Sequence, residues 1–189
     1  MEANKIAVLG LDNVGKTCLI RNLFDESSPL DIHPPRTHGI EVSEAILQYN
    51  NEELSILFVD VGGLKVFQKT LWLELISNES NIKGLMYVVD VQNDFSIDSD
   101  MNAFNIVVDN TDVPILVVGN KFDNLDEELG RSMNTNRLFE ILDIVEHKIN
   151  NPFREIIVLP ISVKKRINLD LVIDWLYKTL TIKNKKKYT

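Results

Sequence analysis

The hydrophobic pattern of the chain predicts short buried strands separated by amphipathic segments. Largely apolar runs, typical of strands covered on both faces of a sheet, lie at residues 5–10, 84–90, 114–120 and 155–160. Residues 40–60 predict two further strands joined at Asn50 and Asn51, because that dipeptide between apolar runs is a hairpin signal. The chain is therefore expected to form six strands.

Apolar residues at spacings of three and four predict helices between the strands. The expected helices span residues 16–24, about 97–108, about 135–150 and about 169–180. Residues 25–39 contain three prolines and no periodicity, so they predict a long loop, and such loops in compact domains are usually functional. The alternation favours one α/β domain with a six-stranded, mostly parallel sheet, one antiparallel edge strand, and helices on both faces.

Length and composition fit one soluble globular domain. The chain has 189 residues, of which 44% are hydrophobic and 25% charged, and its net charge is −8. This acidic balance disfavours a general role in binding nucleic acid. The single cysteine, Cys18, excludes an internal disulfide and fits a reducing cytoplasm, where we expect it to be a small buried hydrophobe.

Membrane attachment is expected to be weak. No apolar run approaches the roughly 20 residues of a membrane span, and the N-terminus lacks the arrangement of a signal peptide. Glu2 stands where myristoylation needs glycine, and the C-terminus has no prenylation box. Residues 1–182 are assigned to the folded domain and residues 183–189 to a basic, solvated tail, expected to be disordered. The expected location is the cytoplasm, with peripheral membrane contact left open.

The stretch "GLDNVGKT" at residues 10–17 matches the phosphate-binding pattern G-x-x-x-x-G-K-[ST]. It lies between a predicted strand and a predicted helix, the context that the motif requires, so a plain connecting turn is disfavoured. Lys16 can reach the β- and γ-phosphates of a nucleotide, and the Thr17 hydroxyl can bind Mg²⁺. Backbone N–H groups that can surround the phosphates belong to Asp12, Asn13, Val14, Gly15, Lys16, Thr17 and Cys18.

The tetrapeptide "NKFD" at residues 120–123 favours guanine as the base. Asp123 can accept two hydrogen bonds from the N1–H and 2-amino groups of guanine, whereas adenine would leave this carboxylate unpaired. Asn120 would tie this loop to the phosphate loop, and Lys121 would lay its stem along the purine. The segment "ISVK" predicts a third loop that closes on the guanine oxygen, formed by Ser162, Val163 and Lys164.

The stretch "DVGG" at residues 60–63 follows the second hairpin strand and predicts a metal-linked switch. Asp60 would hold Mg²⁺ through water, and the Gly63 N–H would donate to a γ-phosphate, a bond that exists only with GTP bound. Thr37, near the end of the long loop, is the expected second sensor, with its hydroxyl on the metal. Loss of the γ-phosphate would release both segments in an order–disorder transition.

With these motifs in this order, the chain resembles the Arf/Arl family of small GTPases, in the Ras superfamily, over about residues 5–180. The form "GLDNVGKT", the segment "THGIEV", and "DVGG" where Ras- and Rab-like relatives have D-T-A-G carry the resemblance. It implies the P-loop GTPase fold, Mg²⁺ with GDP or GTP as ligands, and cycling between two nucleotide states. It also implies an exchange factor, a GTPase activator, and effectors on the two switches and the hairpin between them.

Three departures from the family pattern are visible. The family usually carries an amphipathic N-terminal helix, but four residues precede Lys5, which leaves open weak membrane attachment or a trimmed start. The family's exposed aromatic pair on the hairpin is replaced by Ile40 and Val59, so its effectors are not transferred to this chain. The third departure is Leu64, which stands where the family has a glutamine.

Leu64 predicts slow GTP hydrolysis. Related GTPases use glutamine here to orient the attacking water, and leucine offers neither a donor nor an acceptor. Lys16 and Gly63 complete the group expected around the reacting phosphate, and the ground-state contacts should preserve nucleotide binding. Two origins stay open, a natural switch with degraded turnover or a deliberate Gln-to-Leu substitution that locks the GTP form, and the intact remainder of the site favours the second.

Two alternative functions remain. One is a Rag- or Roc-like GTPase that works as a dimer, and the other is a nucleotide-holding scaffold without turnover, which Leu64 supports. A P-loop kinase or ATPase is disfavoured, because it would need an acceptor-binding lid and no N-K-x-D segment. The leading expectation is a monomer that binds guanine nucleotide and no nucleic acid.

The remaining candidates have structural explanations. Surface positions without metal-ligand spacing are expected for His33, His38 and His147. Trp72 and Trp175 lie at helical spacing among apolar residues and are expected in the core. Arg36, in the long loop, is either an internal arginine finger for the γ-phosphate or a solvated cation, and loop mobility favours the second. Gln68 lies a helical turn beyond Leu64, too far to replace the missing glutamine.

Overall fold

The structure, a computed structural model, describes residues 4–24, 34–78, 81–93, 97–122, 138 and 142–185. Several expectations fall outside these residues. They concern the first part of the long loop with His33, the base-recognition residue Asp123, most of the first half of the helix expected at 135–150, and the last residues of the basic tail.

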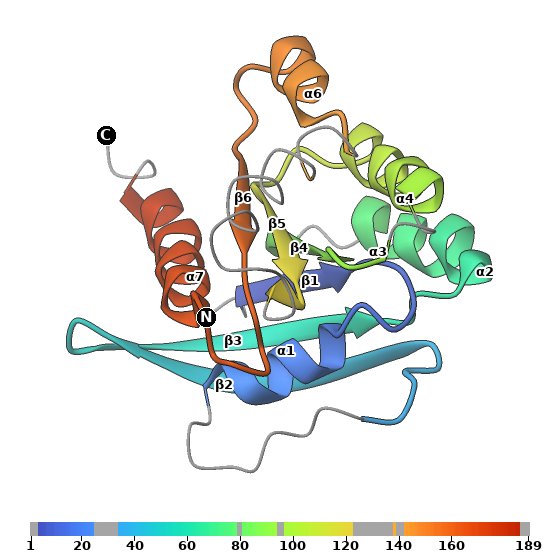
Figure 1. The fold of residues 1–189 in the computed structure, drawn as a ribbon. Coiled ribbons are helices and arrows are strands. Elements are labelled where there is room, and N and C mark those ends of the chain that lie inside the picture. Colours follow the sequence, from blue (N-terminus) through green and yellow to red (C-terminus); the bar gives the residue numbers. More distant parts are fainter. Residues whose placement is uncertain are drawn as a thin grey trace, which may run out of the picture.

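Six strands form one sheet in the order β2–β3–β1–β4–β5–β6 (Figure 1). They are β1 (Asn4–Leu9), β2 (Ile40–Tyr49), β3 (Glu52–Val61), β4 (Ile82–Asp90), β5 (Ile115–Asn120) and β6 (Ile156–Pro160). β2 pairs antiparallel with β3, and the other neighbouring pairs in this order are parallel. The predicted six-stranded, mostly parallel sheet with one antiparallel edge strand is therefore confirmed.

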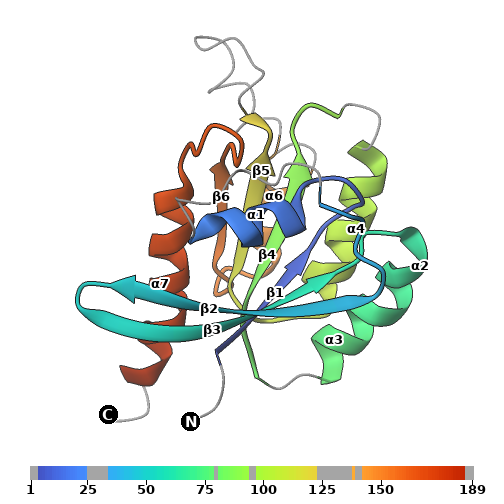
Figure 2. The ribbon, with the colours of Figure 1, turned by 90° about the horizontal axis from the view of Figure 1, so that it is seen from below.

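Helices cover both faces of this sheet. They are α1 (Lys16–Leu23), α2 (Lys65–Phe67), the π-helical turn η1 (Gln68–Trp72), α3 (Leu73–Asn78), α4 (Ile97–Asp109), α6 (Ile144–Asn150) and α7 (Leu169–Lys185). Figures 1 and 2 show α1 and α7 on one face, with α3 and α4 on the other. The β2–β3 hairpin extends beyond the central strands and passes beside α7 (Figure 2).

Each face of the sheet has its own apolar core, because β1, β4 and β5 are buried along most of their length. Successive residues of a strand point to opposite faces, so Ile6 packs in the core with α1 and α7, whereas Ala7 packs in the core with α4. Trp72 and Trp175 are both buried, one in each core, as the sequence predicted.

Two element bounds differ from the prediction. α7 continues to Lys185, past its expected end near residue 180, so the first residues of the assigned tail are helical. A helical segment at 65–78 follows the hairpin, whereas the predicted order of elements passed directly to the next strand. That segment changes from α to π and back to α turns, and it contains Trp72, which the sequence analysis placed at helical spacing.

The carboxyl ends of the parallel strands lie at the same end of the sheet, and the predicted site residues lie there. In the strand register, Asp60 of β3 lies opposite Val8 of β1, and Asn120 of β5 lies opposite Asp90 of β4. The phosphate loop follows β1, and the loop that begins with Ile161 follows β6. In open α/β sheets, ligands bind outside this end.

Candidate functional site

The loop between β1 and α1 is a tight turn pressed against two neighbouring strands. Gly10 has a φ of +141°, and a Cβ on it would lie 2.2 Å from the carbonyl oxygen of Val88 in β4. Gly15 has a φ of +96°, and a Cβ there would lie 2.4 Å from Nδ2 of Asn120 in β5. Only glycine fits such positions, so the motif glycines let the loop backbone approach its neighbours closely.

Lys16 begins α1 and is buried inside this loop. Its Nζ donates to the carbonyl oxygens of Gly10 at 3.1 Å and Leu11 at 2.8 Å. Burial lowers the pKa of Lys16, and the charges of Asp60 and Asp12 oppose that shift. An ammonium group that is poorly hydrated and held among carbonyl oxygens would be strongly stabilised by hydrogen bonds to phosphate oxygens.

Three residues from distant parts of the chain meet beside Lys16. The Thr17 hydroxyl donates to Oδ2 of Asp60, and the Thr37 hydroxyl oxygen lies 2.9 Å from that of Thr17 and 3.4 Å from the same carboxylate oxygen. Burial raises the pKa of Asp60, while the hydrogen bonds from both threonines and the charge of Lys16 lower it.

The chemistry of this cluster fits Mg²⁺. Asp60 is 2% exposed, and its Oδ1 is buried without a hydrogen-bond partner among the described residues. Such an oxygen is costly unless something occupies the space beside it. Two hydroxyls and a carboxylate are hard oxygen donors of the type that Mg²⁺ accepts, directly or through water. Thr17, Thr37 and Asp60 are therefore residues that could hold the ion.

The segments that carry Thr37 and Gly63 contact each other and the phosphate loop. The N–H of Gly62 donates to the carbonyl oxygen of Gly39 at 2.9 Å. A Cβ on Gly63 would lie 2.2 Å from the carbonyl carbon of Leu11, so no side chain fits there. The segment with Thr37 and the segment with Gly63 are therefore joined directly by a backbone hydrogen bond.

Leu64 follows this contact but does not belong to the cavity wall. Its side chain is half-buried, and its carbonyl oxygen accepts a hydrogen bond from the N–H of Phe67 at 2.8 Å, at the start of α2. Neither Leu64 nor Gln68 is among the described residues that line the cavity. Gln68 is buried in η1, and its Nε2 has no hydrogen-bond partner among the described residues.

Asn120 joins the far end of the site to the phosphate loop. It is buried at the end of β5, and its Nδ2 donates to the carbonyl oxygen of Val14 at 2.9 Å. Its Oδ1 accepts from the N–H of Val163 at 3.3 Å. One side chain thus connects the loop after β1 with the loop after β6.

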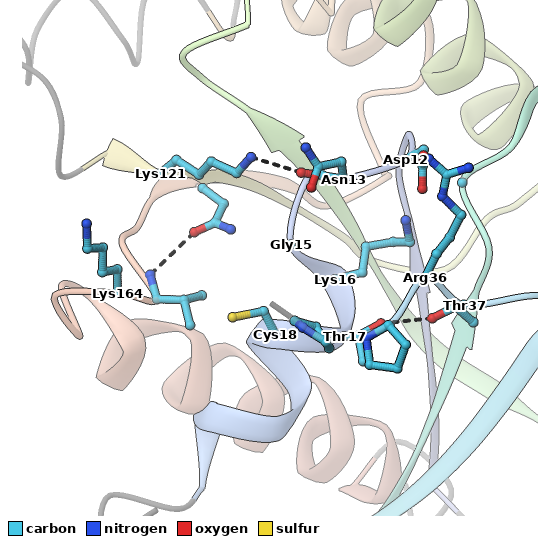
Figure 3. Close-up of a pocket in the computed structure, with 15 residues that line it drawn as sticks. Asp12, Asn13, Gly15, Lys16, Thr17, Cys18, Arg36, Thr37, Lys121 and Lys164 are labelled. Atoms are coloured by element: carbon cyan, nitrogen blue, oxygen red, sulfur yellow. Dashed lines mark hydrogen bonds and ion pairs between the residues drawn. The ribbon is translucent and has the colours of Figure 1, made fainter. Parts of the chain in front are cut away.

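Lys121 makes a second connection between the end of β5 and the phosphate loop. Its Nζ donates to the carbonyl oxygen of Asn13 at 2.9 Å (Figure 3) and forms an ion pair with Oδ2 of Asp90 at 2.7 Å. The sequence analysis did not identify Asp90, whose position at the end of β4 was the available signal. Lys121 also lines the cavity.

The loop after β6 is held by its own backbone. Ser162 is buried, forms a backbone bridge with Ile167, and accepts a hydrogen bond at Oγ from the N–H of Lys165 at 3.0 Å. Val163 and Lys164 then line the cavity. Asp123 lies outside the described residues; the N–H of the preceding Phe122 donates to the carbonyl oxygen of Ile161 at 3.0 Å.

These loops enclose an elongated cavity of about 640 Å³, within the usual size of small-molecule sites. Figure 3 shows Lys121 and Lys164 toward one end and Thr17, Arg36 and Thr37 toward the other. The lining residues are Asp12, Asn13, Gly15, Lys16, Thr17, Cys18, Pro34, Pro35, Arg36, Thr37, Gly63, Asn120, Lys121, Val163 and Lys164.

Three residues differ from their expected surroundings. Arg36 pairs through Nη2 with Oδ2 of Asp12 at 2.6 Å, so it is not simply a solvated cation. His147 is half-buried, with Nε2 2.8 Å from Oδ1 of Asn105, whereas a surface position was expected. Val59 is 3% exposed and belongs to the core, so it does not replace an exposed aromatic residue.

Comparisons with known proteins agree with this geometry. A sequence model described as the ADP-ribosylation factor family matches residues 1–180. The chain belongs to the ADP-ribosylation factor family. It is an Arf-like small GTPase of the Ras superfamily, and membership supports a GTP-binding switch.

Curated relatives include both Arf-like proteins and other GTPases. The ADP-ribosylation factor-like protein 8c of Arabidopsis thaliana is 27% identical over 177 residues, which cover 92% of this chain and 86% of that protein. The GTPase Der of Mycoplasmopsis agalactiae is 28% identical over 133 residues, covering 67% of this chain and 29% of that protein. The GTPase Era of Clostridioides difficile is 26% identical over 177 residues, covering 89% and 52%.

A solved structure shares the fold of this Arf-family chain. It is the Arl6 BBS3 small GTPase from Trypanosoma brucei with the bound nucleotide analogue GppNp. The TM-score is 0.72 at 20% identity, and the match covers 95% of this chain and 98% of the other. Among the described residues, no helix combines the length and apolar character needed to cross a membrane.

Proposed function

We propose that this Arf-family chain is a guanine-nucleotide switch that binds Mg²⁺ through Thr17, Thr37 and Asp60 and hydrolyses GTP very slowly because of Leu64. The meeting of Thr17, Thr37 and Asp60 beside Lys16 carries the proposal. These residues come from three separate elements, and a plain strand–turn–helix connection has no need of their convergence.

The chain's own groups would recognise the phosphates as follows. Lys16 donates from Nζ to phosphate oxygens, and the Gly63 N–H donates to the terminal phosphate. Thr17 and Thr37 would hold the metal with their hydroxyl oxygens, and Asp60 would hold it through water. When bound, Mg²⁺ neutralises charge on the β- and γ-phosphates.

The switch itself rests on the contact between two segments. The bond between Gly62 and Gly39 joins the segment with Thr37 to the segment with Gly63. A γ-phosphate would hold both segments at once, and its loss would release both. Partner proteins would therefore recognise the nucleotide state at the surface next to these segments.

Guanine specificity is assigned to Asp123, supported by the fixed position of its neighbours. Asn120 bonds to Val14 of the phosphate loop and to Val163 of the loop after β6, and Lys121 bonds to Asn13 of the phosphate loop. An aspartate carried by such a loop would meet the N1–H and 2-amino groups of guanine, and mismatch with adenine would leave a carboxylate unpaired.

Competition binding tests this assignment. GTP and GDP, but not ATP, should displace a fluorescent GDP analogue, and Asp123→Asn should shift preference toward xanthine nucleotides, whose 2-oxo group has the opposite polarity. Asp98→Asn removes an exposed carboxylate at the start of α4 and serves as the control. Equal displacement by ATP and GTP would refute guanine specificity.

A scaffold that holds nucleotide without turnover is the second candidate, and Leu64 favours it. Leucine cannot hold the attacking water, and no glutamine is among the described residues lining the cavity. A scaffold would keep GTP after extended incubation even in the Leu64→Gln variant, whereas a slow switch would regain hydrolysis.

Effectors of a switch would use the apolar edge strand beside it. Exposed apolar side chains, with exposures of 46%, 58%, 59% and 63%, are Ile40, Val42 and Ile46 of β2 and Val66 of α2. Apolar side chains gathered on a surface are typical of protein-binding sites. We assign this strip to partner binding by a monomeric GTPase with peripheral membrane contact at most.

A further inference from the structure

One ion pair joins the two walls of the cavity at its phosphate end. Nη2 of Arg36 lies 2.6 Å from Oδ2 of Asp12, and both residues line the cavity. Figure 3 shows the Arg36 side chain reaching from the segment with Thr37 toward the phosphate loop. The pair therefore links a segment expected to move with a loop expected to stay in place.

The surroundings of this pair place it where phosphate charge would be. Arg36 precedes Thr37, whose hydroxyl belongs to the metal-binding cluster. Asp12 is close enough to Lys16 for its charge to oppose the lowering of the Lys16 pKa by burial. Lys121 and Lys164, at the base end, lie on the other side of Lys16 in Figure 3.

We propose that Arg36 is a second cationic residue for the terminal phosphate and that Asp12 competes with the phosphate for it. This inference rests on the proposed guanine-nucleotide switch. The guanidinium presents several N–H donors in one plane, which suits phosphate oxygens as well as a carboxylate. Exchange of Asp12 for a phosphate keeps Arg36 paired, so the step leaves the guanidinium with an anionic partner throughout.

The exchange would make affinity depend on the number of phosphates. A triphosphate carries more negative charge than a diphosphate, and its terminal phosphate would lie near Lys16, Arg36 and Gly63, which line the same cavity. The Asp12 carboxylate, in contrast, repels any phosphate near it. Arg36 therefore favours the triphosphate, and Asp12 reduces that preference by repelling the phosphate and by holding Arg36.

The pair is too exposed to be needed only for folding. The Arg36 side chain is 55% exposed and that of Asp12 is 30% exposed. Ion pairs this exposed contribute little to stability. Substitution of either residue should therefore leave a folded protein in which nucleotide selectivity can be measured.

Equilibrium binding of GDP and of a non-hydrolysable GTP analogue, with Mg²⁺ present, tests the inference. Arg36→Ala should lower the affinity for the analogue by about tenfold and the affinity for GDP by less than about twofold, as expected for a lost charge-assisted contact to one phosphate. Asp12→Asn should raise the affinity for the analogue more than the affinity for GDP. In the double variant, the gain from Asp12→Asn should shrink, because the freed arginine is gone.

A matched arginine provides the control. Arg21 of α1 is 41% exposed, lies 3.8 Å from Glu41, and does not line the cavity, so Arg21→Ala should change neither affinity. Equal weakening of both nucleotides by Arg36→Ala, or no weakening, would overturn the inference while leaving the switch intact. If the unaltered chain binds no guanine nucleotide, the proposed function itself fails.

Discussion

The two ends of the cavity are built from different kinds of structure. At the base end, the contacts come from the ends of β5 and β6, and Asn120 is buried with both amide atoms paired. At the phosphate end, Arg36 and Thr37 lie on a segment without regular structure, and Arg36 is largely exposed.

This difference suggests separate roles: the base end would provide affinity for any guanine nucleotide, and the phosphate end would distinguish GTP from GDP. Buried hydrogen bonds from Asn120 to the phosphate loop and to the loop after β6 hold the base end in one arrangement, so it would bind every guanine nucleotide alike. The contacts among Thr17, Thr37 and Asp60, and the ion pair of Arg36 with Asp12, involve side chains that could exchange each other for a metal ion or phosphate. The phosphate end would therefore distinguish one nucleotide from another.

Thr17→Asn should have the largest effect and should be selective. Loss of the hydroxyl would remove the proposed metal ligand, so affinity for a GTP analogue should fall by about 100-fold, and affinity for GDP far less. Titration with fluorescent nucleotides measures both. Thr70→Asn, which alters an exposed hydroxyl bonded to Val66, should change neither. Normal affinity for the analogue would remove Thr17 from the metal site.

Leu64→Gln should change the rate of reaction rather than binding. A glutamine can orient the attacking water, so single-turnover hydrolysis should rise by at least about tenfold, with the affinity for a GTP analogue unchanged. Leu171→Gln alters a 40% exposed leucine of α7 and controls for the added amide. If the Leu64→Gln variant hydrolyses GTP no faster, the assignment of this position to the attacking water is wrong.

Asn120→Ala should weaken both nucleotides by a similar factor. It leaves the buried carbonyl of Val14 and N–H of Val163 without their partner, and a loss of roughly tenfold for GDP and for the analogue follows. Asn102→Ala, which removes an exposed amide bonded to Asp98 in α4, is the control. A loss confined to the triphosphate would contradict the division between the two ends.

Tyr177→Phe should have the smallest effect. The Tyr177 ring stacks on Tyr49 at 4.4 Å, far along the hairpin from the site, and its hydroxyl donates to Glu52 at 2.8 Å. The stack survives the change and the lost bond is exposed, so both affinities should change by less than about twofold. A larger change for one nucleotide would mean that the phosphate end extends along the hairpin to α7.

The local sequence pattern was sufficient to predict a feature that lies within one element or one turn. Short apolar runs predicted the strands, and a glycine-rich turn between a strand and a helix predicted the phosphate loop. The segment at 65–78 was missing from the predicted order of elements, although Trp72 within it was recognised at helical spacing; its division into α and π turns came only from the structure. Val59 was misplaced because the end of β3 is buried on both faces, with Phe58 in one core and Val59 in the other.

The sequence by itself determined the strand order along the chain, the loop glycines, and the residue types able to bind phosphate, metal and guanine, since these depend on local geometry and on the chemistry of single side chains. The tertiary structure decided which of them meet. The contact between Thr37 and Asp60 and the pair of Arg36 with Asp12 join residues far apart in the chain. Such pairs depend on packing between elements, which no local pattern records.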